Sequence, residues 1–261
     1  MSSLPTPTFD RTVRGSGPGL LLAHGAGGGI EPNYGPLMDG LAEHFTVVGP
    51  DYPGTGRTPR SDAPLTLDGV ADELVAAAVA EGLETFAVTG YSLGAAVAVR
   101  AATRHPERVT ALVLTAGFAR PNPRFTLATE LWRQLLQADD PAGLTAFGAL
   151  LGFTAPAADA LSQDDVDAML AAGWDAVPPG ALEHVDLASR VDVLDDLPRL
   201  SVPTLVISTT EDSLVTPFHH HQLAEGIPGA RLAELATGHL PFVERPKEWL
   251  DLMVGFLAAS A

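Results

Sequence analysis

The sequence predicts an α/β protein in which helices cover both faces of a mostly parallel β-sheet. Short apolar runs bounded by Gly, Pro or Asp alternate with longer helical patterns, which is typical of parallel sheets. A second observation is that residues 119–198 carry helical patterns and no good strand. A third is a serine between two glycines, Ser92, which follows one apolar run and opens a helical pattern.

The predicted strands are short and continuous, which suits strands buried on both faces; they cover residues 20–23, 45–48, 86–89, 111–115, 204–208 and 231–235. The predicted helices between them cover residues 34–43, 67–80, 92–104, 217–225 and 246–257. Thr66 is expected to cap the second of these helices. Pro217 and Pro246 suit the first positions of the last two.

Residues 119–198 interrupt the alternation, with helices predicted over 126–136, 142–151, 164–172 and 181–189. We expect this insertion to form a helical cap over the carboxyl edge of the sheet. The remaining residues, 1–118 and 199–261, are expected to form the core domain. The aromatic residues around the insertion have the spacing of an ordinary core, although we expect a few of them to face a substrate: Phe125, Trp132, Phe147, Phe153 and Trp174.

Charge and composition exclude several classes of function. The 261 residues include 15 basic and 32 acidic side chains, a formal net charge of −17, so binding to nucleic acid or to a membrane surface is disfavoured. The absence of cysteine excludes disulfides, thiolate nucleophiles and cysteine-based metal sites. The first twenty residues lack the pattern of a signal peptide, and no apolar run is long enough to span a membrane. We therefore expect a cytoplasmic protein that acts on a small molecule.

The sequence Gly90-Tyr91-Ser92-Leu93-Gly94 lies at the end of a predicted strand and the start of a predicted helix. A sharp turn of this kind holds the serine hydroxyl out at the top of the sheet, at a helix N-terminus that favours developing negative charge. The two glycines leave room for neighbouring backbone. The pattern by itself also fits an ordinary glycine-rich turn capped by a serine.

Three further segments supply what a serine nucleophile needs. A glycine-rich loop at residues 24–29 follows the first predicted strand and can present N–H groups to an oxyanion, together with the N–H of Leu93. Asp212 and His239 each follow a later predicted strand. A histidine base activates a serine, and a buried carboxylate orients that base. Glu211 is the alternative acid.

Over nearly its whole length the chain resembles the α/β-hydrolase superfamily, specifically a serine esterase or lactonase with a helical cap. The resemblance is carried by these segments in order: HGAGGG at 24–29, DYPGTG at 51–56, GYSLG at 90–94, RHPERV at 104–109, TTED at 209–212 and TGHLPFVERP at 237–246. It implies a mostly parallel eight-stranded sheet with the cap inserted after the sixth strand. It also implies that Ser92 is the nucleophile, Asp212 the orienting acid and His239 the general base. Ala26 and Leu93 would supply the N–H groups of the oxyanion hole.

The expected substrate is a carboxylic ester, lactone or thioester with a small to medium apolar acyl group. We expect the following residues to contact it: Gly25, Gly27, Tyr91, Phe118, Trp132 and Leu240. No metal or organic cofactor is expected. The adjacent histidines His219, His220 and His221 do not share a helix face, so they do not indicate a metal site. The same triad also fits a biosynthetic cyclase or acyltransferase, a carbon–carbon bond hydrolase, a cofactor-free perhydrolase, or a receptor-like protein that binds without turnover.

Overall fold

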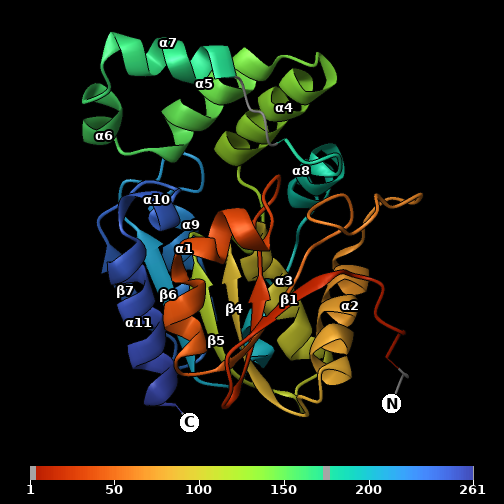
Figure 1. The fold of residues 1–261 in the computed structure, drawn as a ribbon. Helices are drawn as coiled ribbons and strands as arrows, with labels where there is room; N and C mark the ends of the chain where they lie inside the picture. Colours follow the sequence, from red (N-terminus) through yellow and green to blue (C-terminus); the bar gives the residue numbers. More distant parts are fainter. Residues whose placement is uncertain (1–3, 173–176, 261) are drawn as a thin grey trace.

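The computed structural model describes residues 4–172 and 177–260, which form a seven-stranded sheet with helices on both faces and above one edge (Figure 1). The strand order is β1-β3-β2-β4-β5-β6-β7, and every pair is parallel except β1 with β3. The strands are β1 (Arg11–Arg14), β2 (Gly19–Ala23), β3 (Thr46–Pro50), β4 (Phe86–Tyr91), β5 (Val109–Thr115), β6 (Thr204–Thr209) and β7 (Arg231–Leu235).

The sheet corrects two expectations that came from the family resemblance. It has seven strands rather than eight, because only β1 precedes β2 in the described part of the chain. Residues 4–10 form no strand, and Pro5 and Pro7 within them remove two of the backbone donors that a strand ladder needs. For the same reason the helical insertion follows β5, the fifth strand of this sheet, rather than a sixth.

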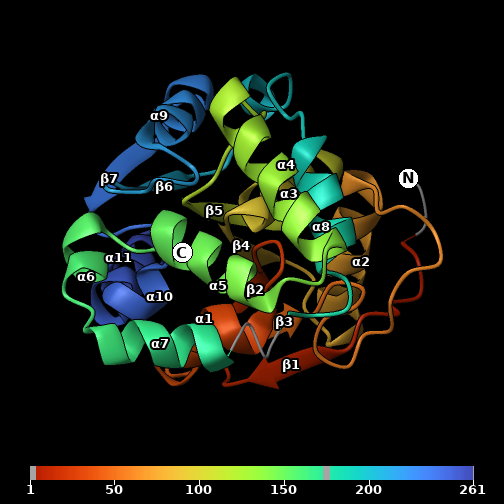
Figure 2. The ribbon, with the colours of Figure 1, turned by 90° about the horizontal axis from the view of Figure 1, so that it is seen from above.

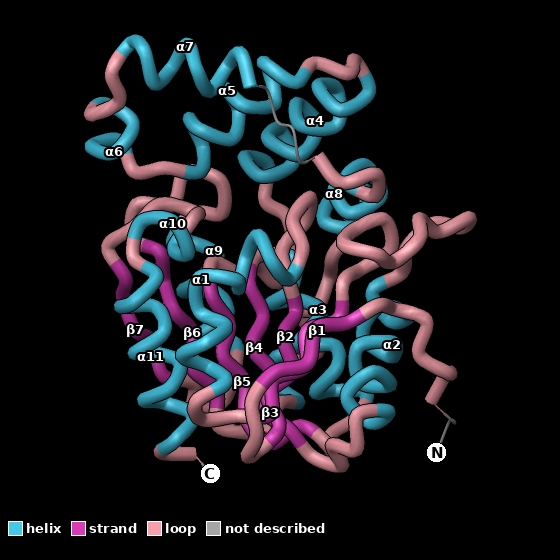
Figure 3. The backbone as a smooth tube through the Cα atoms, in the orientation of Figure 1, coloured by secondary structure: helices cyan, strands magenta, loops and turns pink. Residues whose placement is uncertain are grey.

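The strands lie at the centre of the molecule, with helices on either side (Figure 3). Their apolar side chains belong to two separate cores. One core contains residues of α2 (Leu67–Ala80), α3 (Leu93–Arg104) and α9 (Pro217–Gly226). The other contains residues of α1 (Ile30–Ala42) and α11 (Pro246–Ala258), with α10 (Pro241–Glu244) beside it. Alternate residues of a strand serve opposite faces, so a continuous apolar run is buried on both sides.

The insertion between β5 and β6 forms helices that lie beyond the carboxyl ends of the strands (Figures 1 and 2). These cap helices are α4 (Pro123–Gln137), α5 (Pro141–Gly152), α6 (Ala155–Asp159), α7 (Gln163–Ala172) and α8 (Ala181–Ser189); a short 3₁₀ turn, Leu197–Arg199, leads back to the core. The division into core and cap domains at residues 119 and 198 stays a prediction. Trp174 lies outside the described residues.

Capping side chains set where several helices begin. The Asn122 side chain accepts a hydrogen bond from the N–H of Phe125, and Pro123 occupies the first turn, so α4 begins earlier than the apolar pattern alone predicted. Thr66 caps α2 as expected, accepting from the N–H of Gly69. No helix in the described ranges is long and apolar enough to cross a membrane.

Candidate active site

Ser92 lies in a tight turn between β4 and α3. Its φ of 54° and ψ of −118° place it in a region that non-glycine residues rarely adopt, which holds the side chain above the edge of the sheet. Neighbouring backbone passes very close: a Cβ on Gly94 would lie 2.0 Å from the carbonyl oxygen of Ala23, and one on Gly90 would lie 2.2 Å from that of Gly94. Glycine is required at both positions for the turn to close.

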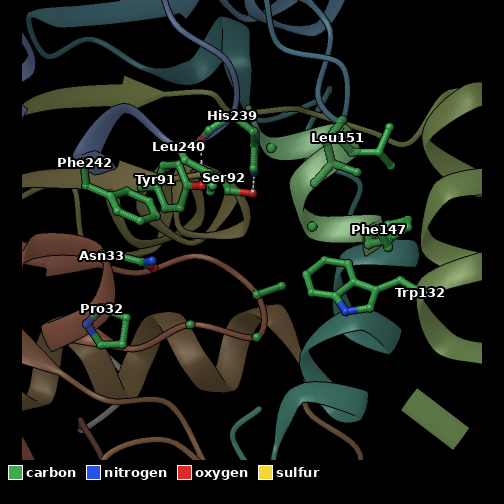
Figure 4. A pocket seen from close by; sticks show the side chains of 16 residues that line it. Pro32, Asn33, Tyr91, Ser92, Trp132, Phe147, Leu151, His239, Leu240 and Phe242 are labelled. Carbon is green, nitrogen blue, oxygen red and sulfur yellow. Dashed lines mark hydrogen bonds between the residues drawn. The ribbon is translucent and has the colours of Figure 1, made fainter. Parts of the chain in front are cut away.

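The structure brings together the three residues that the sequence selected. His239 Nε2 lies 3.0 Å from Ser92 Oγ (Figure 4). His239 Nδ1 lies 2.7 Å from Asp212 Oδ2. All three residues are buried. A carboxylate only accepts hydrogen bonds, so Nδ1 of the neutral imidazole carries the proton and Nε2 is left to accept from the serine hydroxyl.

Asp212 is held by hydrogen bonds on both carboxylate oxygens. Oδ1 accepts from the N–H groups of Leu214 and Val215, at 2.9 and 2.8 Å. Oδ2 accepts from the Thr209 hydroxyl at 3.0 Å in addition to the imidazole. Glu211, the alternative acid, has an exposed side chain. Asp212, and not Glu211, is therefore the carboxylate that contacts the imidazole.

In the described structure the loop after β2 leaves the N–H group of Ala26, which lines the same cavity as Ser92, without a protein acceptor. The N–H of Gly25 donates to Asn33 Oδ1 at 3.0 Å, and that of Gly28 donates to the Gly25 carbonyl at 3.4 Å. The N–H of Gly27 donates to a histidine, His184. Within the described ranges, the N–H groups of Ala26 and Leu93 donate to no protein acceptor. These are the two donors expected to form the oxyanion hole.

A buried histidine, His24, supports the start of this loop. Its Nδ1 donates to the Gly25 carbonyl at 2.8 Å, while its Nε2 accepts from the N–H of Tyr52 at 2.9 Å. The ring also stacks on the Tyr52 ring, with centroids 3.8 Å apart. Burial, with a smaller effect of His184, lowers the pKa of His24 to about 3. His24 is therefore a neutral structural residue at neutral pH.

His184, from α8 of the cap, supports the middle of the same loop. Its Nδ1 accepts from the N–H of Gly27 at 3.3 Å, and its Nε2 donates to the carbonyl oxygen of Pro53 at 3.0 Å. Burial lowers the pKa of His184 to about 4. A cap residue thus fixes the conformation of the core loop that carries the Ala26 N–H.

A cavity of about 260 Å³ lies between Ser92 and the cap (Figure 4). Four of the residues expected to contact substrate line it: Gly27, Tyr91, Trp132 and Leu240. Phe147, one of the aromatic residues of which a few were expected to face substrate, also lines it. Its other lining residues include Asn33, Leu151, Leu214 and Phe242, which the sequence analysis did not select. No charged side chain is found among the described residues that line it.

Two residues expected at the substrate, Phe118 and Gly25, lie elsewhere. Phe118 is fully buried and packs on Phe125, with ring centroids 4.5 Å apart, so it belongs to the core beneath the cap. Gly25 is covered by the Tyr91 ring, since a Cβ on it would lie 2.8 Å from Tyr91 Cε1. Neither lines the cavity. Position in a motif did not indicate which way these residues face.

The three adjacent histidines of α9 face different surroundings. His219 and His220 are buried, whereas His221 is exposed. His219 lies edge-on to Phe118 and Phe125, and His220 Nδ1 lies 3.0 Å from the Ser208 hydroxyl. The helix therefore turns these side chains away from a shared point.

A buried nucleophile elbow at the carboxyl edge of a parallel sheet, joined to a histidine and a carboxylate, defines the α/β-hydrolase class. The chain belongs to this family: the family model described as "alpha/beta hydrolase fold" matches residues 18–246. The chain is 35% identical to pyrrolizixenacetamide deacetylase from Xenorhabdus hominickii over 254 residues, which cover 95% of this chain and 94% of the relative.

Solved structures agree with this assignment. A hydrolase from Pseudomonas aeruginosa PA01 superposes with a TM-score of 0.80 at 26% identity, over 95% of this chain and 93% of the other. The enol-lactonase from Burkholderia xenovorans LB400 gives a TM-score of 0.83 at 22% identity, over 96% of each chain. The second similarity supports the fold alone.

Proposed function

We propose that this protein is a serine hydrolase that cleaves a carboxylic ester, lactone or thioester through an acyl-enzyme on Ser92. The observation that carries the proposal is the continuous hydrogen-bonded chain from Ser92 Oγ through His239 to Asp212, which opens onto a cavity. Such a chain activates a hydroxyl that is otherwise a weak nucleophile.

In the first half-reaction, Ser92 Oγ attacks the substrate carbonyl carbon while His239 Nε2 takes the hydroxyl proton. The carbonyl oxygen becomes an oxyanion, for which the N–H groups of Ala26 and Leu93 are the available donors. Collapse of this intermediate breaks the bond to the leaving group, which receives the proton from His239. In the second half-reaction water gives a proton to His239 and attacks the acyl-enzyme. The acid then leaves, and the proton returns to Ser92.

The cavity supports a neutral acyl group of small to medium size. Its walls are mostly apolar, with aromatic rings from both core and cap, and its described lining residues include no cation that would pair with an anionic substrate. The net charge of −17 also repels anions. A small neutral molecule is therefore the proposed partner of this site.

Amide deacetylation is a second candidate, favoured by one observation: the relative that shares 35% identity is named a deacetylase. Amide hydrolysis passes through the same tetrahedral intermediate, but its leaving group is an amine. An amine leaving group needs the proton from His239 more than an alkoxide does. A comparison of matched acetyl esters and acetanilides separates the two candidates.

The test is hydrolysis of p-nitrophenyl esters from acetate to decanoate, and of p-nitroacetanilide, by the wild type and by Ser92→Ala. We expect ester turnover by the wild type and a loss of about 10⁴-fold or more in kcat for the variant, because the nucleophile is removed. Ser189→Ala is the matched control, since the Ser189 hydroxyl only contacts the carbonyl oxygen of Asp186 on an exposed helix end.

If the wild type hydrolyses none of these substrates and an organophosphate fails to label Ser92, the proposal is wrong. The receptor-like alternative or a specialised transferase, cyclase or carbon–carbon bond hydrolase would then be favoured. Activity that is equal in the wild type and in Ser92→Ala would also reject it.

A further inference from the structure

Asn33, in the first turn of α1, lines the cavity with a side-chain amide whose orientation is fixed. Its Oδ1 accepts the N–H of Gly25 at 3.0 Å. Because an N–H group can donate only to the oxygen of the amide, the other end of the side chain is Nδ2. Figure 4 shows the amide directed toward the cavity.

The Nδ2 group donates to no acceptor in the described part of the chain, although the residue is only 5% exposed. The other polar side chains whose hydrogen bonds are known at this cavity are committed. Ser92 and His239 bind each other, and the Tyr91 hydroxyl donates to the His239 carbonyl oxygen at 2.8 Å. Because Asn33 lines the cavity, an acceptor atom of a ligand there can receive the hydrogen bond that the described protein atoms leave unused.

The amide packs against a residue of the loop other than Ala26, the expected oxyanion donor. A Cβ on Gly28 would lie 2.6 Å from Asn33 Oδ1 and 2.9 Å from Nδ2, so the amide packs directly on Gly28. Gly28 comes two residues after Ala26 in the loop. The glycine at position 28 thus makes room for the amide in the wall of the same cavity that Ser92 and Ala26 line.

We propose that the Asn33 Nδ2 group binds a second oxygen atom of the substrate, so that this enzyme prefers neutral acyl compounds that carry an ether, keto or hydroxyl oxygen close to the scissile carbonyl. This inference rests on the proposed function. An anionic group is disfavoured, because no cation is found among the described lining residues.

The test compares p-nitrophenyl methoxyacetate with p-nitrophenyl butanoate, and the 4-oxopentanoate with the pentanoate. The two esters of a pair have the same chain length, and only one of them carries an additional acceptor oxygen in its acyl group. Asn33→Asp keeps an oxygen for the Gly25 N–H but loses the donor, and Asn33→Ala removes the whole amide. The measured quantity is the ratio of the kcat/KM values of the two esters in a pair. A change in oxyanion stabilisation alters both values equally and therefore cancels in this ratio.

We expect at least one pair's ratio to fall about tenfold or more in both variants, the size expected for a lost hydrogen bond at a buried site. The matched control is Asn122→Asp, since aspartate caps a helix as well as asparagine does and Asn122 is not among the cavity-lining residues. Thermal melting and organophosphate labelling of Ser92 verify that each variant is folded with an intact site.

Ratios that stay within twofold of the wild type in both pairs would overturn the inference while leaving the proposed function intact. An equal fall for both members of each pair would also overturn it, and would make Asn33 a third oxyanion donor instead. If the wild type hydrolyses none of the four esters, the proposed function fails and the inference fails with it.

Discussion

At the scale of single residues, the turn at Ser92, the proposed nucleophile, depends on backbone that is packed against backbone. Ser92 has a positive φ, and the carbonyl oxygens of Ala23 and Gly94 lie where side chains would otherwise begin. A flexible side chain can move aside when a neighbour grows, but a carbonyl in a parallel sheet cannot move without breaking its ladder. The elbow is therefore intolerant of even one methyl group.

Replacement of Gly94 by alanine tests this intolerance. The new Cβ would lie 2.0 Å from the carbonyl oxygen of Ala23, so we expect Gly94→Ala to lower the free energy of unfolding by at least about 2 kcal/mol. Gly255→Ala is the matched control. Gly255 lies within α11, and no atom lies within 4 Å of the position that its Cβ would take. Alanine there is therefore expected to raise the free energy of unfolding by about 0.5–1 kcal/mol. Urea denaturation measures both, and equal midpoints for the two variants would contradict the packing argument.

Local sequence selected the three residues that the structure joins by hydrogen bonds, but only part of the cavity wall. Ser92, Asp212 and His239 were predictable because each lies where a strand ends, and the ends of parallel strands meet at one edge. Phe118 was assigned to the substrate and lies in the core instead, whereas Asn33 was missed. Which way a side chain points depends on the docking of whole helices, and residue order does not encode that directly.

At the scale of elements, long apolar patterns predicted the structure well and short exposed elements escaped prediction. The strands from β2 to β7 and the longer helices match their apolar runs to within a few residues. β1 and α10 have four residues each and α6 has five, too few to show a period. β1 is also only half-buried or exposed, so its sequence lacks the apolar run of a central strand.

The small helix α10 connects the cap to the histidine loop through Glu244. Oε1 accepts from the N–H of Thr154, the capping residue of α6, at 2.9 Å. Oε2 accepts from the N–H of Gly238 at 3.3 Å and from the Thr237 hydroxyl at 3.2 Å. One carboxylate thus holds the cap against the residue that precedes His239.

Glu244→Ala is expected to lower kcat about tenfold while KM stays within about twofold, because a histidine that is less well held transfers protons less effectively. Glu244→Gln, which keeps one acceptor oxygen, should recover part of this loss. The control is Glu248→Ala, since that side chain is 60% exposed on α11. Steady-state kinetics on the best p-nitrophenyl ester measures both kcat and KM. An unchanged kcat in Glu244→Ala would show that the carboxylate has no role in positioning His239.

At the scale of the whole molecule, several buried histidines make stability depend on pH. Burial lowers the pKa of His24 to about 3, and that of His184 and His220 to about 4. In the unfolded chain these groups take up protons near pH 6.5. Between the folded and unfolded values the unfolded state binds more protons, so the free energy of unfolding rises with pH through this window and falls on acidification. Asp51 acts in the opposite direction, because burial raises its pKa.

We expect the free energy of unfolding to drop between pH 7 and pH 5 by about 1–2 kcal/mol for each of these histidines, less the opposing contribution of Asp51. Urea titrations at half-unit pH intervals measure the slope, and titration of the histidine ring protons by NMR assigns it. A stability that is flat or rising from pH 7 down to pH 5 would be incompatible with neutral buried histidines.

The cavity has walls from two sources: Ser92 and His239 come from loops of the core, whereas Trp132, Phe147 and Leu151 come from the cap. Mutations in the cap can therefore change which molecule is accepted without touching the atoms that perform the reaction. In evolution, such a protein can acquire a new substrate in small steps while every intermediate retains its catalytic machinery. Substitution of the cap has one limit. A cap that loses His184 or the hydrogen bond from Thr154 to Glu244 also loosens the loops that carry the Ala26 N–H and His239.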